Sequence, residues 1–198
     1  MTFVTLQSVN FPDRVIRHQV FLGELHRKVD LISERDKEDA TFDMQELGRN
    51  HVRFHAVNFP SHVLRHQDLR IKLSELRFDI SAPGTSPPET AEHRLTREDS
   101  IFARVDRRTG AVMFYATSFP PGVENDLIFD GTPVLAHCIR HRDFHLFLDQ
   151  RIFDPGEPFS STEEQVGNKL AAQFDGDATF VIIEPLAERF RGAPPEPR

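Results

Sequence analysis

The stretch Ser8-Val9-Asn10-Phe11-Pro12, with Ile16-Arg17-His18 three residues behind it, decides the fold of this chain because the same pattern occurs again. The second copy is Ala56-Val57-Asn58-Phe59-Pro60 with Leu64-Arg65-His66, and the third is Thr117-Ser118-Phe119-Pro120 with Ile139-Arg140-His141 after about fifteen extra residues. An Asp-x-x-Phe motif follows each Arg-His pair, at Asp39–Phe42, Asp99–Phe102 and Asp177–Phe180. Motifs that recur three times in one order predict three copies of one structural unit.

Short apolar segments separated by turn-forming residues predict β-strands within each copy. In the first copy these segments are Phe3–Leu6, Val15-Ile16, Phe21–Leu25 and Thr41–Met44, and each is too short for a helix. Four strands in each of three copies predict an all-β fold, a β-trefoil of three four-stranded repeats with pseudo-threefold symmetry. A β-propeller would need at least four such units.

The predicted domain occupies residues 1–190, with lobes at about 1–49, 50–109 and 110–189 and a flexible tail at 191–198. Two segments depart from the repeat, a Pro-rich loop at 81–90 and an insertion from Gly122 to His137. Extra length of this kind is best tolerated at the surface. The best helix candidate, from Glu163 to Phe174, lies in an insertion of the third copy.

Composition limits the classes of function. The chain has 198 residues, a formal net charge of -7 and one cysteine, Cys138. An acidic chain is poorly suited to nucleic acid, whose binding depends on clustered Lys and Arg. No apolar run approaches the length of a membrane span, and the N-terminus lacks the features of a signal peptide. We therefore expect a monomer with no membrane or nucleic-acid partner and no cofactor, in a compartment that the sequence leaves open.

The repeated motifs carry a specific resemblance. Ser8–Pro12, Ile16-Arg17-His18, the following Phe21-Leu22-Gly23 and the later Asp39-Ala40-Thr41-Phe42 are similar to the repeat of the arabinofuranosidase B C-terminal domain, the family-42 carbohydrate-binding modules. The likeness extends from about residue 5 to 186. It implies a β-trefoil that binds the arabinofuranosyl side chains of arabinoxylan or arabinan in pockets of its lobes, without hydrolysing them.

The resemblance also implies which residues line the pockets. They are the His of each Arg-His and the Asp of each Asp-x-x-Phe, giving His18 with Asp39, His66 with Asp99, and His141 with Asp177. The chemistry suits a furanose, because a carboxylate accepts two hydrogen bonds, an imidazole donates or accepts another, and a Phe ring supplies an apolar surface. The first copy keeps the whole pattern. In the second copy Leu69 replaces the Phe that follows the His in the other copies, and in the third copy Ser118 replaces the Asn before Phe-Pro.

Each candidate residue also has a structural interpretation. The His and Asp residues can form buried hydrogen-bonded pairs that lock each lobe, and most of the 18 Phe, including Phe42, Phe102 and Phe180, are expected in the core. Asn10 and Asn58 are interpreted as turn residues that bond their own backbone. The arginines of the Arg-His pairs are interpreted as structural partners rather than sugar ligands.

Three other functions remain to be weighed. A metal site at His137, His141 and His145 is disfavoured, since on a strand these residues would be spread too far apart for one ion. Glycoside hydrolysis needs two carboxyl groups about 5–9.5 Å apart, and the repeat should place one Asp in each lobe with no second acid beside it. A protein-interaction trefoil without a glycan ligand, or an accessory domain of an arabinofuranosidase, stays open as an alternative, because fold alone does not decide function.

Overall fold

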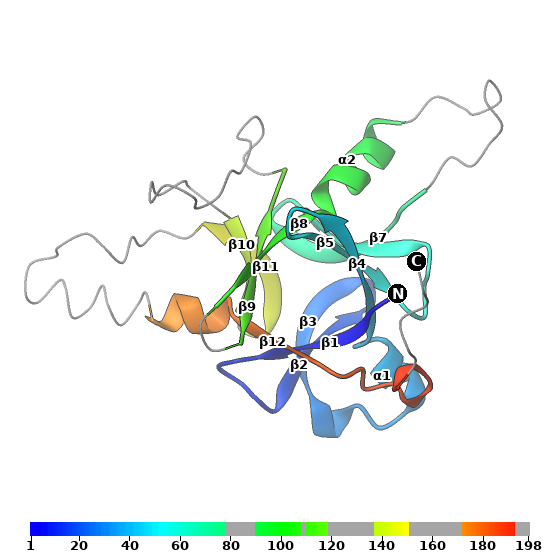
Figure 1. The fold of residues 1–198 in the computed structure, drawn as a ribbon, viewed down its shortest axis with the longest axis vertical. Coiled ribbons are helices and arrows are strands. Elements are labelled where there is room, and N and C mark those ends of the chain that lie inside the picture. The colour runs from blue at the N-terminus through cyan, green and yellow to red at the C-terminus, as the bar shows by residue number, and fades with distance from the viewer. Residues whose placement is uncertain (78–89, 108–109, 119–136, 151–171, 193–198) are drawn as a thin grey trace, which may run out of the picture.

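The computed structural model describes residues 1–77, 90–107, 110–118, 137–150 and 172–192, and these residues form an antiparallel β-structure with short helices at its periphery (Figure 1). The strands are β1 (Phe3–Ser8), β2 (Arg14–Gln19), β3 (Leu22–Arg27), β4 (Phe42–Gly48), β5 (His51–Ala56), β6 (His62–Gln67), β7 (Arg70–Glu75), β8 (Phe102–Asp106), β9 (Val112–Ala116), β10 (His137–Arg142), β11 (His145–Gln150) and β12 (Phe180–Ile183). The helices are η1 (Lys28–Asp30), α1 (Glu34–Glu38), α2 (Ala91–Asp99) and η2 (Glu188–Phe190). In this part of the chain, no helix is long and apolar enough to cross a membrane.

All twelve strands belong to one sheet, which closes on itself. β1 pairs with β4, β4 with β5, β5 with β8, β8 with β9, β9 with β12, and β12 returns to β1. The remaining strands form three hairpins, β2–β3, β6–β7 and β10–β11, which are hydrogen-bonded to one another. Closure leaves no free edge in this circuit, which removes the unpaired backbone groups that an open sheet presents.

The prediction of a β-trefoil built from three four-stranded repeats is therefore wrong, although the all-β class is confirmed. Six of the described strands close an antiparallel β-barrel and the other six form the three hairpins, and three of the barrel pairings join strands from different sequence copies, as between β1 and β12. The motifs show which segments resemble each other. They carry no information about which strand edges pair, because backbone hydrogen bonds form whatever the side chains are.

Alternating burial explains why these segments form strands around one core. In β1, Val4 and Leu6 are buried in the core, and in β5, Val52 and Phe54 occupy the same kind of position. Phe42, Phe102 and Phe180, one from each Asp-x-x-Phe motif, are completely buried in this core, so their predicted core role is confirmed. The barrel interior is thus filled with side chains and presents no channel of its own.

The three hairpins end in turns that the sequence makes unusual. The central residues of these turns have positive φ, at Val20-Phe21 (49° and 62°), Asp68-Leu69 (51° and 62°) and Asp143-Phe144 (49° and 66°). Such turns normally carry Asn or Gly, and a β-branched or bulky residue with positive φ is strained.

Hydrogen bonds between the hairpins hold these turns in place. The carbonyl of Phe21 accepts from Leu73 N, that of Leu69 from Leu148 N, and that of Phe144 from Leu25 N, each at 2.7 Å. Each turn is therefore anchored on a strand of the next hairpin, in a cycle of three. These hydrogen bonds stabilise the strained backbone of each turn. A fixed backbone in turn fixes the direction in which the turn side chains point.

Each Asp of the Asp-x-x-Phe motifs lies at the end of a short helix that the sequence analysis did not predict in the first two copies. Asp39 follows α1 as its C-cap, Asp99 is the last residue of α2, and Asp177 ends a helical turn at 172–177. The helix predicted from Glu163 to Phe174 lies mostly outside the described residues, and only its last residues fall within that helical turn. The predicted loop at 81–90, the insertion from Gly122 to His137 and the tail also lie almost entirely outside them.

Candidate functional site

The first His–Asp cluster, called site I, contains His18, Asp39 and Asn58. Asn58 lies between the other two, because its Nδ2 donates to Asp39 Oδ1 at 2.6 Å and its Oδ1 accepts from His18 Nε2 at 3.0 Å. Arg17 Nη2 donates to the other carboxylate oxygen, Asp39 Oδ2, at 2.8 Å. A backbone hydrogen bond from His18 N to Asp39 O, 3.0 Å, joins β2 to the end of α1. Site I therefore combines two sequence copies, since Asn58 belongs to the second.

The corresponding cluster at the third Arg-His, called site III, contains His141, Asp177 and Asn10. Asn10 Nδ2 donates to Asp177 Oδ1 at 2.7 Å and Arg140 Nη2 donates to Asp177 Oδ2 at 3.0 Å. His141 Nε2 lies 3.5 Å from Asp177 Oδ1 but is buried and makes no hydrogen bond in the described part of the chain. Buried polar atoms without a partner are rare, and this nitrogen is such an exception among the described residues.

The middle cluster, called site II, contains His66, Asp99 and Ser118. The Ser118 hydroxyl donates to Asp99 Oδ1 at 2.8 Å and lies 2.9 Å from His66 Nε2, so a serine replaces the bridging asparagine. Arg65 does not pair with Asp99 here. Its guanidinium instead contacts Thr96 and Glu92 of α2, with Glu92 Oε1 at 3.0 Å. Site II keeps the His and the Asp but differs from the other two in everything that surrounds them.

A side chain from a strained hairpin turn stands beside site I, and another stands beside site III. In site I, Phe21 packs against Phe59, with ring centroids 5.3 Å apart, and Phe59 lies edge-on to His18 at 5.7 Å. In site III, Phe11 lies 5.4 Å from both Phe144 and His141.

The turn side chains remain accessible, unlike the histidines. Phe21, Leu69 and Phe144 are 42%, 40% and 37% exposed, whereas the three histidines are buried. Two of the three clusters thus have an accessible aromatic face next to their polar groups.

Burial keeps the three histidines neutral. Desolvation lowers the pKa of His18, His66 and His141 below the ordinary value of 6.5, and it outweighs the opposing attraction of Asp39, Asp99 and Asp177. A neutral imidazole offers one N–H donor and one acceptor, which suits hydroxyl groups. Phosphate or carboxylate ligands would instead favour a protonated ring.

We expect stability to fall as the pH is lowered from about 7.5 to 5. The folded-state pKa of each of these histidines is lowered, so near and below the ordinary value of 6.5 the unfolded chain binds more protons than the folded chain. The free energy of unfolding then decreases with decreasing pH. Thermal melts across this range measure the effect, and His141→Gln, which cannot titrate, should reduce the slope. A melting temperature that stays constant or rises toward pH 5 would contradict the assignment of neutral buried histidines.

The carboxylates are not arranged as expected, because site I has a second acid. Arg17 Nη2 lies 2.8 Å from both Asp36 Oδ1 and Asp39 Oδ2, so these two carboxylates are neighbours, as the acids of a glycosidase are. A glycosidase needs one of the pair protonated, with a raised pKa. Here hydrogen bonding to Ser33, with a smaller contribution from Arg17, lowers the pKa of Asp36. Asp36 is therefore not the acid with a raised pKa that such a pair requires.

Site II resembles a Ser-His-Asp arrangement in composition only. In that arrangement the serine donates to the imidazole and the Asp holds the opposite ring nitrogen. Ser118 instead donates to Asp99, and the His66 nitrogen that lies near Ser118 is also the one 3.5 Å from Asp99 Oδ1. The imidazole therefore cannot act as a base toward Ser118. Among the residues with assigned positions, no group of three His, Cys, Asp or Glu side chains is arranged to hold a metal ion.

The structure brings together each predicted His–Asp pair but adds residues that sequence reasoning missed. Asn10 and Asn58 lie in bends, as predicted, but their side-chain amides bind the carboxylates of sites III and I instead of their own backbone. No local sequence signal marks this role, because it depends on how one copy lies against the next. Gly176 makes room for this contact, since a Cβ at that position would lie 2.0 Å from Asn10 Oδ1.

Comparisons with solved structures show which proteins share this fold. A crystal structure of an arabinofuranosidase complexed with arabinofuranosyl-alpha-1,2-xylobiose is 16% identical with a TM-score of 0.61, covering 94% of this chain and 31% of that one. A GH54 a-l-arabinofuranosidase soaked with a cyclic sulfate inhibitor gives 16% identity and a TM-score of 0.60, over 93% of this chain and 31% of that one. The chain thus spans about a third of the length of these enzymes. At such identities the likeness concerns the fold alone.

A protein with a different activity has a similar fold. The cytolethal distending toxin from Actinobacillus actinomycetemcomitans is 11% identical with a TM-score of 0.54, covering 98% of this chain and 96% of that one. No curated protein matches the sequence. The fold is therefore shared by proteins of unrelated function and does not by itself identify the ligand.

The sequence itself is more specific than the fold. Residues 1–103, just over half of the chain and including both partners of site I, match the family model for the alpha-L-arabinofuranosidase B (ABFB) domain. The chain therefore belongs to the alpha-L-arabinofuranosidase B (ABFB) domain family.

Proposed function

We propose that this domain binds carbohydrate without cleaving it, and that its ligands are arabinofuranosyl side chains of arabinoxylan or arabinan. One observation carries the proposal, namely that a carboxylate, a neutral imidazole and an amide or hydroxyl converge three times, in two cases beside an accessible aromatic ring. Family membership supports it, as does the arabinofuranosyl ligand in the name of one structural relative.

The polar groups suit a furanose because they can both accept and donate. Each carboxylate oxygen has two acceptor positions, and in site I Oδ1 accepts from Asn58 while Oδ2 accepts from both Nε and Nη2 of Arg17. The remaining acceptor position on Oδ1 can take a sugar hydroxyl, while the bound donors fix the carboxylate in one orientation. This preorganisation reduces the entropy lost when the sugar binds.

The three sites should differ in strength, with site I first, site III second and site II last. Sites I and III share an asparagine that donates to the aspartate, an Arg–Asp pair and a phenylalanine at the hairpin turn. Site II has Ser118 and Leu69 in the corresponding places, and its arginine is turned toward α2. We expect Asp39→Asn to weaken polymer binding most, Asp177→Asn less and Asp99→Asn least. Asparagine is the suitable replacement because alanine would leave Arg17 and Arg140 with one partner fewer.

Retention on insoluble arabinoxylan, compared with the same polymer after enzymatic removal of arabinose, tests the proposal. Retention is expected on the decorated polymer only, and the supernatant should contain no more released sugar than the blank. One pocket with a few polar contacts should bind a monosaccharide with a Kd on the order of 0.1–1 mM. Equal retention on both polymers would contradict the arabinose assignment. Sugar release that disappears in Asp39→Asn would contradict the non-catalytic role.

A further inference from the structure

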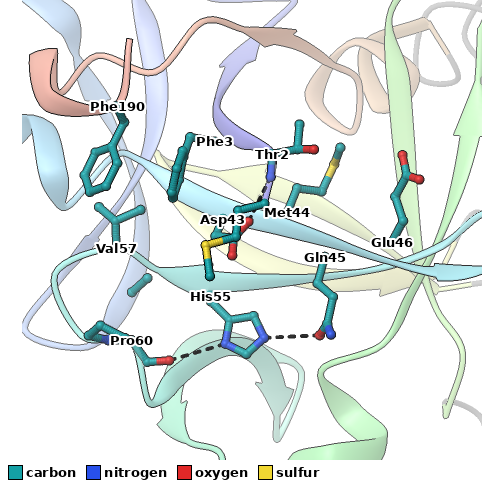
Figure 2. Close-up of a pocket in the computed structure, with 12 residues that line it drawn as sticks. Thr2, Phe3, Asp43, Met44, Gln45, Glu46, His55, Val57, Pro60 and Phe190 are labelled. Carbon is teal, nitrogen blue, oxygen red and sulfur yellow. Dashed lines mark hydrogen bonds between the residues drawn. The ribbon is translucent and has the colours of Figure 1, made fainter. Parts of the chain in front are cut away.

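A pocket of about 620 Å³ lies on the outer surface of the barrel (Figure 2), and its lining includes none of the residues of the three His–Asp pairs. The floor of the pocket lies where β4 pairs with β1 and β5. There, Asp43 of β4 lies opposite Phe3 of β1 on one side and His55 of β5 on the other. These residues alternate with core residues along their strands, so they face outward. Phe190 of η2 forms one wall, with its ring centroid 4.4 Å from that of Phe3.

The pocket offers apolar surface and uncharged or acidic polar groups. Asp43 Oδ1 accepts from Thr2 N at 3.0 Å, and the carboxylate forms no other hydrogen bond within the described ranges. His55 Nε2 lies 3.3 Å from the side-chain oxygen of Gln45, and burial lowers the pKa of His55. The lining residues that the structure describes include no lysine or arginine. An anionic ligand would therefore meet the carboxylates of Asp43 and Glu46 without a cationic side chain, whereas a neutral polyol would find acceptors and a ring face.

This pocket shares a turn with site I. Val57 and Pro60 line the pocket, and the two residues between them, Asn58 and Phe59, belong to site I. His55 Nδ1, which lies 3.4 Å from the carbonyl of Pro60, fastens this turn to β5. A ligand unit in the pocket and another in site I would therefore lie on opposite sides of one short, anchored segment.

We propose that this pocket binds a neutral pyranose unit of the polymer backbone to which an arabinofuranosyl group in site I is attached. The inference rests on the function proposed above and extends it from the arabinofuranosyl branches of the polysaccharide to its backbone. The volume is in the range typical of small-molecule sites. Phe3 and Phe190 provide the apolar surface for a sugar ring, and Asp43 with His55 and Gln45 provides hydrogen-bonding groups for its hydroxyls.

The test uses xylotetraose, an unbranched pyranose oligosaccharide that contains no arabinose. Titration of the ¹⁵N-labelled chain should give saturable shifts at the pocket, and Asp43→Asn and Phe190→Ala should each weaken this binding by about tenfold or more. Asp13→Asn makes the same chemical change at an exposed position outside the pocket and should have no effect. Melting curves of both pocket variants check that they fold.

Site I variants separate this inference from the proposed function. Asp39→Asn should leave xylotetraose binding unchanged, while Asp43→Asn should leave methyl arabinofuranoside binding unchanged and still weaken retention on arabinoxylan. Absence of saturable xylotetraose binding, or unchanged binding in both pocket variants, overturns the inference while arabinofuranoside binding continues to support the function. Failure of methyl arabinofuranoside to bind overturns the function instead.

Discussion

Replacing both Asp39 and Asp177 with asparagine is expected to abolish retention on arabinoxylan. Each single change removes a negative charge from the site and turns a hydrogen-bond acceptor into a donor, which should weaken one site by about tenfold or more. Two sites on one rigid body bind a branched polymer with avidity, so losing both should reduce polymer affinity by roughly a hundredfold or more. Depletion isotherms on insoluble arabinoxylan measure the change for the single and double variants.

The matched control for this double variant is Asp99→Asn in site II. It makes the same chemical change in a cluster where a serine stands in for the asparagine and the arginine is turned away. We expect it to lower polymer affinity only slightly. Retention of the double variant at the wild-type level, with an unchanged melting temperature, would contradict the assignment of sites I and III.

Phe54→Ala is expected to cause the largest loss of stability. Phe54 is completely buried, and its ring centroid lies 5.0 Å from that of Phe114 and 6.4 Å from that of Phe102. Removing such a ring costs about 3–5 kcal/mol through lost burial and the cavity that remains. For a chain of this size that corresponds to a fall in melting temperature of roughly 6–20 °C. Differential scanning calorimetry gives the value directly.

The contrasting variant is Phe21→Ala. This ring is 42% exposed and stands beside site I, so its removal should weaken polymer binding with only a small change in melting temperature. A larger loss of stability in Phe21→Ala than in Phe54→Ala would show that the central cluster of rings does not hold the barrel together.

The sequence was sufficient to predict the His–Asp pairs because the motifs that carry the family resemblance are local and recur. His18 and Asp39 are 21 residues apart in one copy, and the resemblance implies that they line one pocket. Asn58 could not be assigned in this way, since its role depends on how one copy lies against the next. The same limit applies to the barrel, whose closing pairs such as β1 with β12 join residues from opposite ends of the chain.

Some local features of the structure leave only a weak signal in the sequence. α1 has only five residues and is stabilised by a capping box in which Ser33 and Asp36 exchange hydrogen bonds, so apolar periodicity could not reveal it. At site II the motif Arg65-His66 is intact, yet Arg65 contacts α2 instead of Asp99. Identical residues in a motif therefore did not guarantee identical contacts, because the neighbouring helix offers Thr96 and Glu92 as better-placed partners.

The most direct test of the central claim is the response of the histidine rings to methyl arabinofuranoside. Titration of protein labelled with ¹⁵N in its imidazoles follows His18, His66 and His141 individually. Binding in the proposed pockets predicts saturable shifts at His18 and His141, a smaller shift at His66, and loss of the His18 response in Asp39→Asn. Rings that do not respond while the protein still binds arabinoxylan would show that the His–Asp clusters are structural and that the sugar binds elsewhere.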